Sequence, residues 1–328
     1  MDFITQISLA LFAIPAGNYS GIAPMGGEEY VIVDDKAKDD AFKVLNISID
    51  ERKGKVIGVT MKESSVRGGE SVAARDYEGV AFCKQRGAVF VSGEADQQIL
   101  EYGLDGEPTG AKLDVPECFS LQNIRSNYGF ESLTYNAVTQ RFWTTSESTL
   151  KSDGESSSLQ HRDTRNRLRL QSFGLDMKPN AMYAYEMDAP TVKKKKGQYF
   201  FGVPSMLATD DGRLIVMERE AFVAKRYFGS FCRIKLYEVD VNGAVEINEK
   251  QSLVQLPASA FVNKRLLCEF KTGISLFRYN FANFEGMCFG PQLADGSQTL
   301  FMIADSQGRY GNSLYRLKDY LRVMKMSK

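Results

Sequence analysis

The stretch DYEGVAF at residues 76–82 is one copy of the motif that decides the fold. An aromatic residue, a polar residue and a small residue precede a short apolar run. Four related copies occur along the 328-residue chain: NYSGIAP at 18–24, GFESLTY at 129–135, GVPSMLA at 202–208 and NFEGMCF at 283–289. Such self-similarity at regular intervals is typical of repeat architectures. The five copies therefore predict five structural repeats.

Each copy is followed by a turn and then by an apolar strand that ends in an acid. Partners in an antiparallel hairpin sit symmetrically about its turn. The turn at 85–87 lies midway between Glu78 and Glu94, and the turn at 138–140 lies midway between Glu131 and Glu147. Turns at 26–27, 211–212 and 294–296 relate the remaining pairs, Ser20 with Asp34, Ser205 with Glu218 and Glu285 with Asp305. Each hairpin is thus expected to bring its two polar residues to one open end.

The repeats have room for four strands each, which is the plan of a β-propeller blade around a central channel. The sequence predicts an all-β chain, residues 1–328, folded as a single propeller domain of four-stranded blades with carboxylates gathered at one channel mouth. Five blades are visible, and the longer third and fourth repeats leave room for a sixth. The alternating stretch 4–14 is expected to complete the last blade. One short helix is expected over roughly 258–270.

Three further stretches carry expectations of their own. Residues 149–170, in the third repeat, begin Ser-rich and become basic, which indicates an insertion loop that leaves the blade at the carboxylate end. The lysine run 193–196 is expected to form a solvated hairpin tip. The run NSLYRLKD at 312–319 is expected to be a strand.

The composition excludes several classes of partner. Lys and Arg number 41, as do Asp and Glu, so no global field favours nucleic acid or an anionic membrane. No run approaches the ~20 apolar residues of a membrane helix, so no transmembrane segment is expected. Five cysteines without a CxxC pair predict neither a disulfide framework nor a zinc site. None of these features determines the oligomeric state.

Carboxylates in a confined space raise one another's pKa, and a bound cation relieves their repulsion. Carboxylate oxygens suit Ca²⁺ or Mg²⁺, and Ca²⁺ is preferred where several loops contribute ligands in irregular geometry. The acids at the hairpin ends form the pool of expected ligands: Glu78, Glu94, Glu131, Glu147, Glu218, Glu285 and Asp305. The alternative is structural, with these acids bound to turn amides of a neighbouring blade or paired with Arg141, Arg162 or Arg219.

Other catalytic machinery is scarce. His161 is the only histidine, which argues against a three-histidine zinc site or a phosphohistidine mechanism, and its polar surroundings indicate a surface position. The GxSxG, HExxH and GxxxxGK[ST] motifs are absent. The route that remains for catalysis is metal-activated water or a carboxylate general base.

Several motif copies resemble those of one known family. The most specific are ATDDGRLIVMERE at 208–220 and NFEGM at 283–287, and NYGFESLTYN at 127–136 adds to them. Together they resemble the phytase-like propeller family described as having esterase-like activity, over nearly the whole chain. The resemblance implies a bacterial protein exported to the periplasm or the extracellular space. Its export signal is expected to be missing from this chain, because Asp2 stands where a basic segment would be.

The resemblance also implies a fold and site residues. It implies a propeller that hydrolyses phosphate esters, and in alkaline propeller phytases, a more distant relation, acid-bound Ca²⁺ binds the substrate phosphates and activates water. The candidate catalytic residues match the family's EG glutamates: Glu78, Glu131 and Glu285. The candidate metal ligands are Glu147 and Glu218, which match the family's strand-end glutamates, and Glu94 and Asp305, which come from the hairpin-end pattern. The candidate phosphate-binding residues do not come from the resemblance; they are basic residues expected near the carboxylate end, Arg162, Arg165 and Arg219.

This sequence departs from the family pattern in places. Ser20 and Ser205 replace the motif glutamate, although serine is common at the latter position, and residues 304–307 read ADSQ where the family has SDDN. The leading hypothesis is a Ca²⁺-assisted hydrolase of a small phosphorylated molecule. A non-catalytic propeller that binds a ligand or a protein is the alternative, and a lactonase-like esterase is a further one. Whether the chain is an enzyme stays open at this stage.

Overall fold

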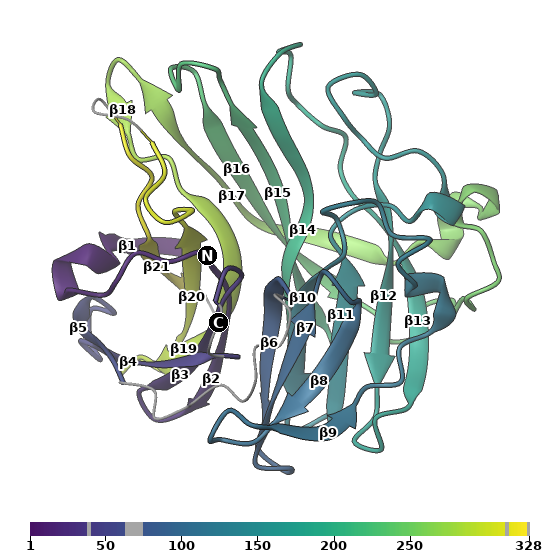
Figure 1. The fold of residues 1–328 in the computed structure, drawn as a ribbon, viewed down its shortest axis with the longest axis horizontal. Coiled ribbons are helices and arrows are strands. Elements are labelled where there is room, and N and C mark those ends of the chain that lie inside the picture. The colour runs from purple at the N-terminus through teal and green to yellow at the C-terminus, as the bar shows by residue number, and fades with distance from the viewer. Residues whose placement is uncertain (38–40, 63–74, 312–314, 327–328) are drawn as a thin grey trace. The chain divides into compact units, whose positions relative to one another are not determined.

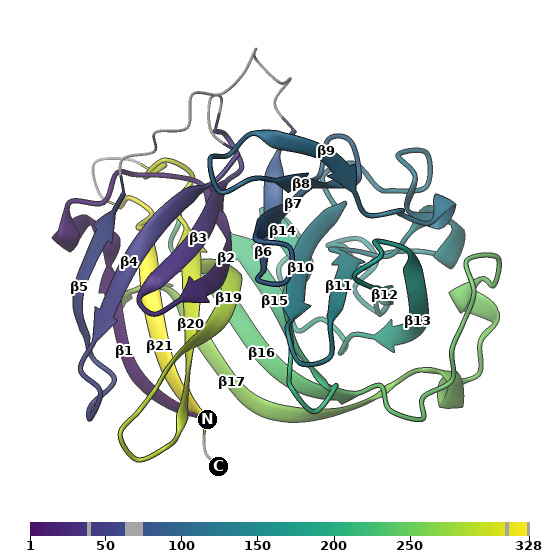
Figure 2. The ribbon, with the colours of Figure 1, turned by 90° about the horizontal axis from the view of Figure 1, so that it is seen from below.

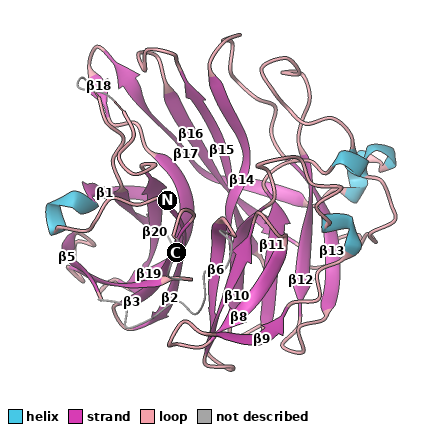
Figure 3. Ribbon diagram, in the orientation of Figure 1, coloured by secondary structure: helices cyan, strands magenta, loops and turns pink. Residues whose placement is uncertain are grey.

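The structure is a computed structural model that describes residues 1–37, 41–62, 75–311 and 315–326. Strands dominate it (Figure 3). The helices of the described ranges are 3-10 turns of three or four residues: η1(Leu9–Phe12), η2(Glu117–Phe119), η3(Lys151–Asp153), η4(Leu253–Gln255) and η5(Ala258–Ala260). None of them is long and apolar enough to cross a bilayer.

Five antiparallel sheets form the blades of a β-propeller fold (Figure 1). Blade 1 contains β2(Tyr19–Gly26), β3(Glu29–Asp34), β4(Lys43–Ile49) and β5(Val56–Met61). Blade 2 contains β6(Tyr77–Cys83), β7(Ala88–Gly93), β8(Gln98–Tyr102) and β9(Pro108–Lys112). Blade 3 contains β10(Phe130–Asn136), β11(Arg141–Ser146), β12(Arg167–Phe173) and β13(Pro179–Glu186). The all-β propeller expected from the repeats is confirmed, and the number of blades is five rather than six.

The last two blades each depart from the simple plan. Blade 4 contains the long strands β14(Gln198–Ala208), β15(Leu214–Val223), β16(Phe231–Asp240) and β17(Asn263–Ser275), which Figure 2 shows side by side, and the short β18(Arg278–Tyr279). Blade 5 contains β19(Asn283–Gln292), β20(Gln298–Asp305), β21(Tyr320–Met326) and β1(Asp2–Ser8). Because β1 pairs antiparallel with β21, the amino-terminal strand completes the last blade, as its alternating pattern predicted. The strand is shorter than expected, since η1 follows Ser8.

The chain divides into two compact units. Unit 1 comprises residues 1–91, 100–111 and 282–328, and unit 2 comprises residues 92–99 and 112–281. Each unit has an apolar core between its sheets: Val31, Val33, Val80 and Val89 belong to that of unit 1. The core of unit 2 includes Trp143, Leu170, Val216 and Val239.

The inner strands of unit 1 approach one another closely, and glycine permits this approach. A Cβ on Gly21 of β2 would lie 2.4 Å from the Glu78 carbonyl oxygen of β6, and a Cβ on Gly286 of β19 would lie 2.8 Å from the Ser20 carbonyl oxygen. Real Cβ atoms are not found at such distances. The glycine after the polar residue of the motif therefore serves the packing of one blade on the next.

Replacing Gly21 with Ala is expected to lower the free energy of unfolding by about 1 to 3 kcal/mol, because the backbone of β6 must move to admit the new methyl group. Urea denaturation followed by circular dichroism measures the change. Gly58→Ala in β5 is the matched control, since a Cβ there meets only the Ser48 hydroxyl, at 3.9 Å. Equal stability of the two variants would contradict the packing role.

Three expectations about secondary structure are wrong. The helix over 258–270 is η5 followed by β17, where Asn263 to Gly273 pair with β16 and satisfy their backbone groups in the sheet. The lysine run 193–196 is exposed, but it lies in the connection between β13 and β14, which belong to different blades. Of the strand expected over 312–319, residues 312–314 lie outside the described ranges, and the described residues 315–319 belong to no named strand, since β21 begins at Tyr320.

The predicted insertion in blade 3 corresponds to a long connection. Residues 147–166 join β11 to β12 and include η3, whereas residues 167–170 are already part of β12. His161 is exposed in this connection, as its polar surroundings indicated.

Candidate functional site

A β-bulge marks the open end of the inner hairpin in several blades. In blades 1, 3 and 5 the register jumps across one residue of the first strand, and these residues are Ser20, Glu131 and Glu285. Blade 4 has a comparable register shift between Gly202 and Ser205. A bulge leaves its extra residue outside the ladder and re-aims the side chain. In blades 1, 3 and 5 the polar residue of the motif is therefore the bulge residue, which symmetry about the turn did not reveal, whereas Ser205 of blade 4 stays in the ladder opposite Met217.

In unit 2, the charges of several hairpin-end side chains act on Tyr128. Burial raises the pKa of this phenol, the Glu147, Glu131 and Glu94 carboxylates raise it further, and the Arg219 guanidinium opposes them. Glu94 follows β7, Glu131 lies in β10 and Glu147 follows β11, so ends of three strands contribute. We call Tyr128, Glu94, Glu131, Glu147 and Arg219 the Tyr128 cluster.

Two members of this cluster form a buried ion pair. The Arg219 guanidinium of β15 pairs with the Glu147 carboxylate, and both side chains are almost fully buried. The Glu147 backbone is fixed as well, because its N–H donates to the Gly129 carbonyl at 2.7 Å and its carbonyl accepts from Val203 N–H at 3.0 Å. Arg219 also lies over the Phe200 ring, 6.0 Å from its centroid. The pair thus joins blade 3 to blade 4 within unit 2.

Glu218, an expected metal ligand, is held by protein groups. Its carboxylate accepts the Tyr185 hydroxyl at 2.6 Å and the Asp188 N–H at 3.1 Å, and it pairs with Lys264 of β17. Burial raises the pKa of Glu218, whereas Lys264 acts in the opposite direction. The Lys264 ammonium lies 4.2 Å from the centroid of the Tyr237 ring. Because Lys264 pairs with Glu218 and lowers its pKa, the Lys264 ammonium is the principal counter-charge of Glu218.

The two remaining candidate arginines have partners near the protein surface. Arg162 donates to the Lys193 carbonyl at 3.3 Å, and Arg165 pairs with Glu186 at 3.2 Å. Arg165 is 53% exposed. The structure thus ties Arg162 to the connection after β13 and Arg165 to the last residue of β13, and their binding of phosphate stays a prediction.

In unit 1, a second acidic group surrounds Asp305 at the end of β20. Burial raises the pKa of Asp305 well above its ordinary value, and Glu285 is the strongest charged contributor, with Asp35 and Asp319 adding to it. The Glu285 carboxylate accepts the side-chain amide of Asn283 at 2.6 Å. Glu78, the remaining candidate, is buried in β6 of the same unit. The candidate residues therefore fall into two groups, one in each unit.

The expected metal ligands differ in how well they fit a cation. Within the ranges that the structure describes, no three His, Cys, Asp or Glu side chains are arranged to hold one ion. Glu147 and Glu218 already pair with Arg219 and Lys264, so their charge does not call for a metal. Asp305 and Glu285 disfavour each other's ionisation, and their hard oxygen donors suit Ca²⁺.

Asp305→Asn is expected to stabilise the metal-free protein at neutral pH. Because the folded-state pKa is raised, the folded protein binds this proton more tightly than the unfolded chain, and stability falls as the pH rises above about 4. The variant lacks this loss. Urea denaturation in chelator at pH 4.5 and pH 7 measures the difference between variant and wild type, which should grow with pH. A difference that is constant or shrinks would contradict the assignment.

The comparison with protein families decides where the chain belongs. The profile of the phytase-like family, described as "esterase-like activity of phytase", matches residues 14–307. The chain belongs to the phytase-like family. The matched region contains all five motif copies, so the resemblance seen in the sequence is confirmed.

Solved structures similar to this phytase-like chain include a luciferin-regenerating enzyme, with 13% identity, a TM-score of 0.43 and coverage of 97% of this chain and 94% of that chain. An endo-arabinase from Bacteroides thetaiotaomicron has 11% identity, a TM-score of 0.45 and coverage of 100% and 98%. A chain of a nidogen/laminin complex has 9% identity, a TM-score of 0.39 and coverage of 94% and 85%. No curated protein matches the sequence.

Sequence reasoning missed several residues of the phytase-like site. Tyr128, Tyr185 and Lys264 surround the hairpin-end acids but stand outside the paired motif positions. A signal existed for Tyr128, which directly precedes the third motif copy. None existed for Lys264, because it lies in the segment that the sequence assigned to a helix.

Proposed function

We propose that this phytase-like protein is a hydrolase of phosphate esters and that the Tyr128 cluster carries out the proton transfers. The observation that carries the proposal is the bulge in β10, which takes Glu131 out of the strand ladder among Tyr128, Glu147 and Arg219. A carboxylate presented in this way suits a general base. Family membership supports a hydrolase-type propeller, and phosphate is the substrate group that the family name suggests.

In the proposed reaction, the Glu131 carboxylate accepts a proton from the water that attacks phosphorus. A new P–O bond forms as the ester P–O bond breaks. The Tyr128 phenol, whose raised pKa keeps it protonated, donates its proton to the leaving oxygen. Arg219 adds positive charge beside the phosphate while it holds Glu147.

We also propose that Ca²⁺ binds at Asp305 and Glu285 in unit 1. The pair disfavours its own ionisation, and a cation relieves that cost. When bound, Ca²⁺ would compensate the negative charge of these two carboxylates within unit 1. A rise in melting temperature when Ca²⁺ is added to chelator-treated protein, lost in Asp305→Asn, would support this part without reference to activity. An unchanged melting temperature would overturn it.

Hydrolysis itself is tested on the purified chain with inositol phosphates and phosphate monoesters, each with Ca²⁺ or with chelator. A carboxyl ester and a lactone complete the panel. We expect turnover of at least one phosphate ester. Turnover of the lactone or carboxyl ester alone would favour the lactonase-like reading, and no turnover of any compound would overturn the proposal.

The second candidate function is a propeller that binds a ligand or protein without catalysis. The observation that favours it is the internal pairing of Glu147 with Arg219 and of Glu218 with Lys264, which gives two hairpin-end acids a structural task. This reading predicts no turnover and no effect of Ca²⁺ on the melting temperature. The family resemblance further leads us to propose export from the cytoplasm, which fractionation of the source organism would test.

A further inference from the structure

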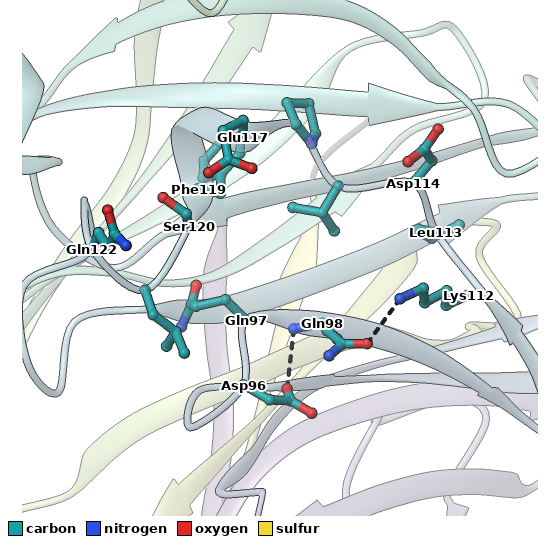
Figure 4. A pocket seen from close by; sticks show the side chains of 13 residues that line it. Asp96, Gln97, Gln98, Lys112, Leu113, Asp114, Glu117, Phe119, Ser120 and Gln122 are labelled. Carbon is teal, nitrogen blue, oxygen red and sulfur yellow. Dashed lines mark hydrogen bonds between the residues drawn. The ribbon is translucent and has the colours of Figure 1, made fainter.

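An open pocket of about 420 Å³ lies in unit 2 between the start of β8 and the segment 112–122 (Figure 4). Its volume falls in the range of small-molecule sites. None of its lining residues belongs to the Tyr128 cluster. The pocket is therefore a different site from the Tyr128 cluster.

Gln97 gives this pocket a polar group that lacks a partner. The residue is only 4% exposed, and its backbone takes a φ of 53°, a region that residues other than glycine rarely adopt. The side-chain N–H donates to the Glu94 carbonyl at 2.7 Å, which fixes the orientation of the amide. The carboxamide oxygen has no hydrogen-bond partner. Figure 4 shows it directed towards the side of the pocket where Ser120 and Glu117 lie.

A buried acceptor without a donor carries an uncompensated desolvation cost. A ligand that donates a hydrogen bond to the Gln97 oxygen recovers this cost on binding. The Gln97 oxygen needs a hydrogen-bond donor, so ligand groups that only accept hydrogen bonds, such as carboxylates and phosphates, cannot pair with it.

The charges around Gln97 narrow the class of donor. Asp96, Asp114 and Glu117 line the pocket against a single lysine, Lys112. Lys112 contacts the Gln98 side chain at 3.2 Å, and Asp114 pairs with Lys178 at 3.0 Å. The pocket therefore keeps a net negative charge, which favours a cationic donor over a neutral one.

The apolar part of the wall fits an alkyl chain rather than a sugar ring. Val115 and Leu121 line the pocket with accessible apolar surface, and Leu121 is exposed. The aromatic residue of the wall, Phe119, is fully buried and offers no face on which a sugar ring can stack. Aliphatic side chains favour a flexible methylene chain, as in the stems of lysine and arginine.

We infer that this pocket binds an aliphatic ammonium or guanidinium cation, whose charged head donates to the Gln97 oxygen beside Asp96 and Glu117 and whose methylene chain lies on Val115 and Leu121. A free amine and the side chain of a basic peptide present the same chemistry. The experiment below separates these two sources.

The test is isothermal titration calorimetry of the full chain with agmatine and cadaverine. Binding of either cation is expected, and 1,5-pentanediol should bind at least tenfold more weakly, because it lacks the charge. Nα-acetyl-arginine amide replaces agmatine in a second arm. Tighter binding of agmatine identifies a free amine as the ligand, and tighter binding of the amide identifies a peptide.

Three variants connect the binding to these residues. Gln97→Met, which removes the acceptor at similar volume, should weaken agmatine about tenfold or more. Glu117→Gln at the exposed rim should weaken it about two- to fivefold without affecting the fold. Asp96→Asn should also weaken agmatine binding about two- to fivefold. Asp105→Asn is its matched control, because each of the two aspartates accepts a hydrogen bond from the backbone N–H two residues later in a turn.

The control variant Asp105→Asn, which lies outside the pocket, should bind agmatine with the affinity of the wild type. The proposal is overturned if neither cation binds wild type at up to about 10 mM. It is also overturned if pentanediol binds as well as cadaverine, or if Glu117→Gln and Gln97→Met both bind agmatine as wild type does.

Discussion

We expect Glu131→Gln to lower kcat for the preferred phosphate ester by about 10² to 10⁴-fold, which is the usual contribution of a general base. The amide keeps the size of the side chain but cannot accept the proton of the attacking water. Because Glu131 is a half-buried bulge residue outside the strand ladder, the fold should tolerate the change. Steady-state kinetics with release of inorganic phosphate measures the effect, and a melting curve verifies folding.

Glu107→Gln is the matched control, since Glu107 lies exposed in the turn between β8 and β9. It should keep wild-type kcat. A loss in Glu285→Gln but not in Glu131→Gln would move the general base to unit 1. Full activity of the Glu131 variant would contradict the role given to the Tyr128 cluster.

Arg169→Met is expected to lower the free energy of unfolding by about 3 to 5 kcal/mol, because it leaves a buried carboxylate without its counter-charge. Arg169 is 1% exposed in β12, and its guanidinium makes two bonds of 2.7 Å to the Asp153 carboxylate. It also donates to the carbonyls of Asn248 and Gln251. One side chain thus fastens the connection between β11 and β12 to the segment after β16. Urea denaturation measures the loss.

Arg165→Met is the control from the same basic segment. Its ion pair with Glu186 is exposed, and such pairs contribute about 0 to 1 kcal/mol. The two arginines stand four residues apart in the sequence, so a difference between the variants isolates the effect of burial. Equal losses would show that Arg169 contributes no more than a surface charge.

Local signals were sufficient to predict the hairpins. In each repeat, a turn sequence separates two runs of β-branched and aromatic residues, and such signals act over only a few residues. The turn at 84–87 between β6 and β7 and the turn at 137–140 between β10 and β11 appear where the sequence indicated. Reliance on local signals also explains why the helix expected at 258–270 was wrong. The apolar spacing there fits a helix or a strand, and pairing with β16 makes the segment a strand.

The candidate site was only partly predictable. The motif marked Glu131 and Glu285, but their exclusion from the ladder depends on how each strand packs against its neighbours. The roles of Glu147 and Glu218 depend on partners that are distant in sequence, Arg219 and Lys264. Sequence alone left metal binding and ion pairing as equal alternatives for these acids, and the structure supplies the counter-charges.

The sequence by itself thus determined the five repeats, their hairpins and the recurrence of a polar residue at each open end, because turns and alternating strands are encoded within a few residues. The tertiary structure alone decided which of those residues became bulges, which acids acquired an internal cation and which polar group, Gln97, was left without a partner. The physical reason is that burial and charge pairing are properties of side chains brought together from separate strands. Within unit 1 the hairpin-end acids disfavour the ionisation of Asp305, and within unit 2 Glu147 and Glu218 have internal counter-charges.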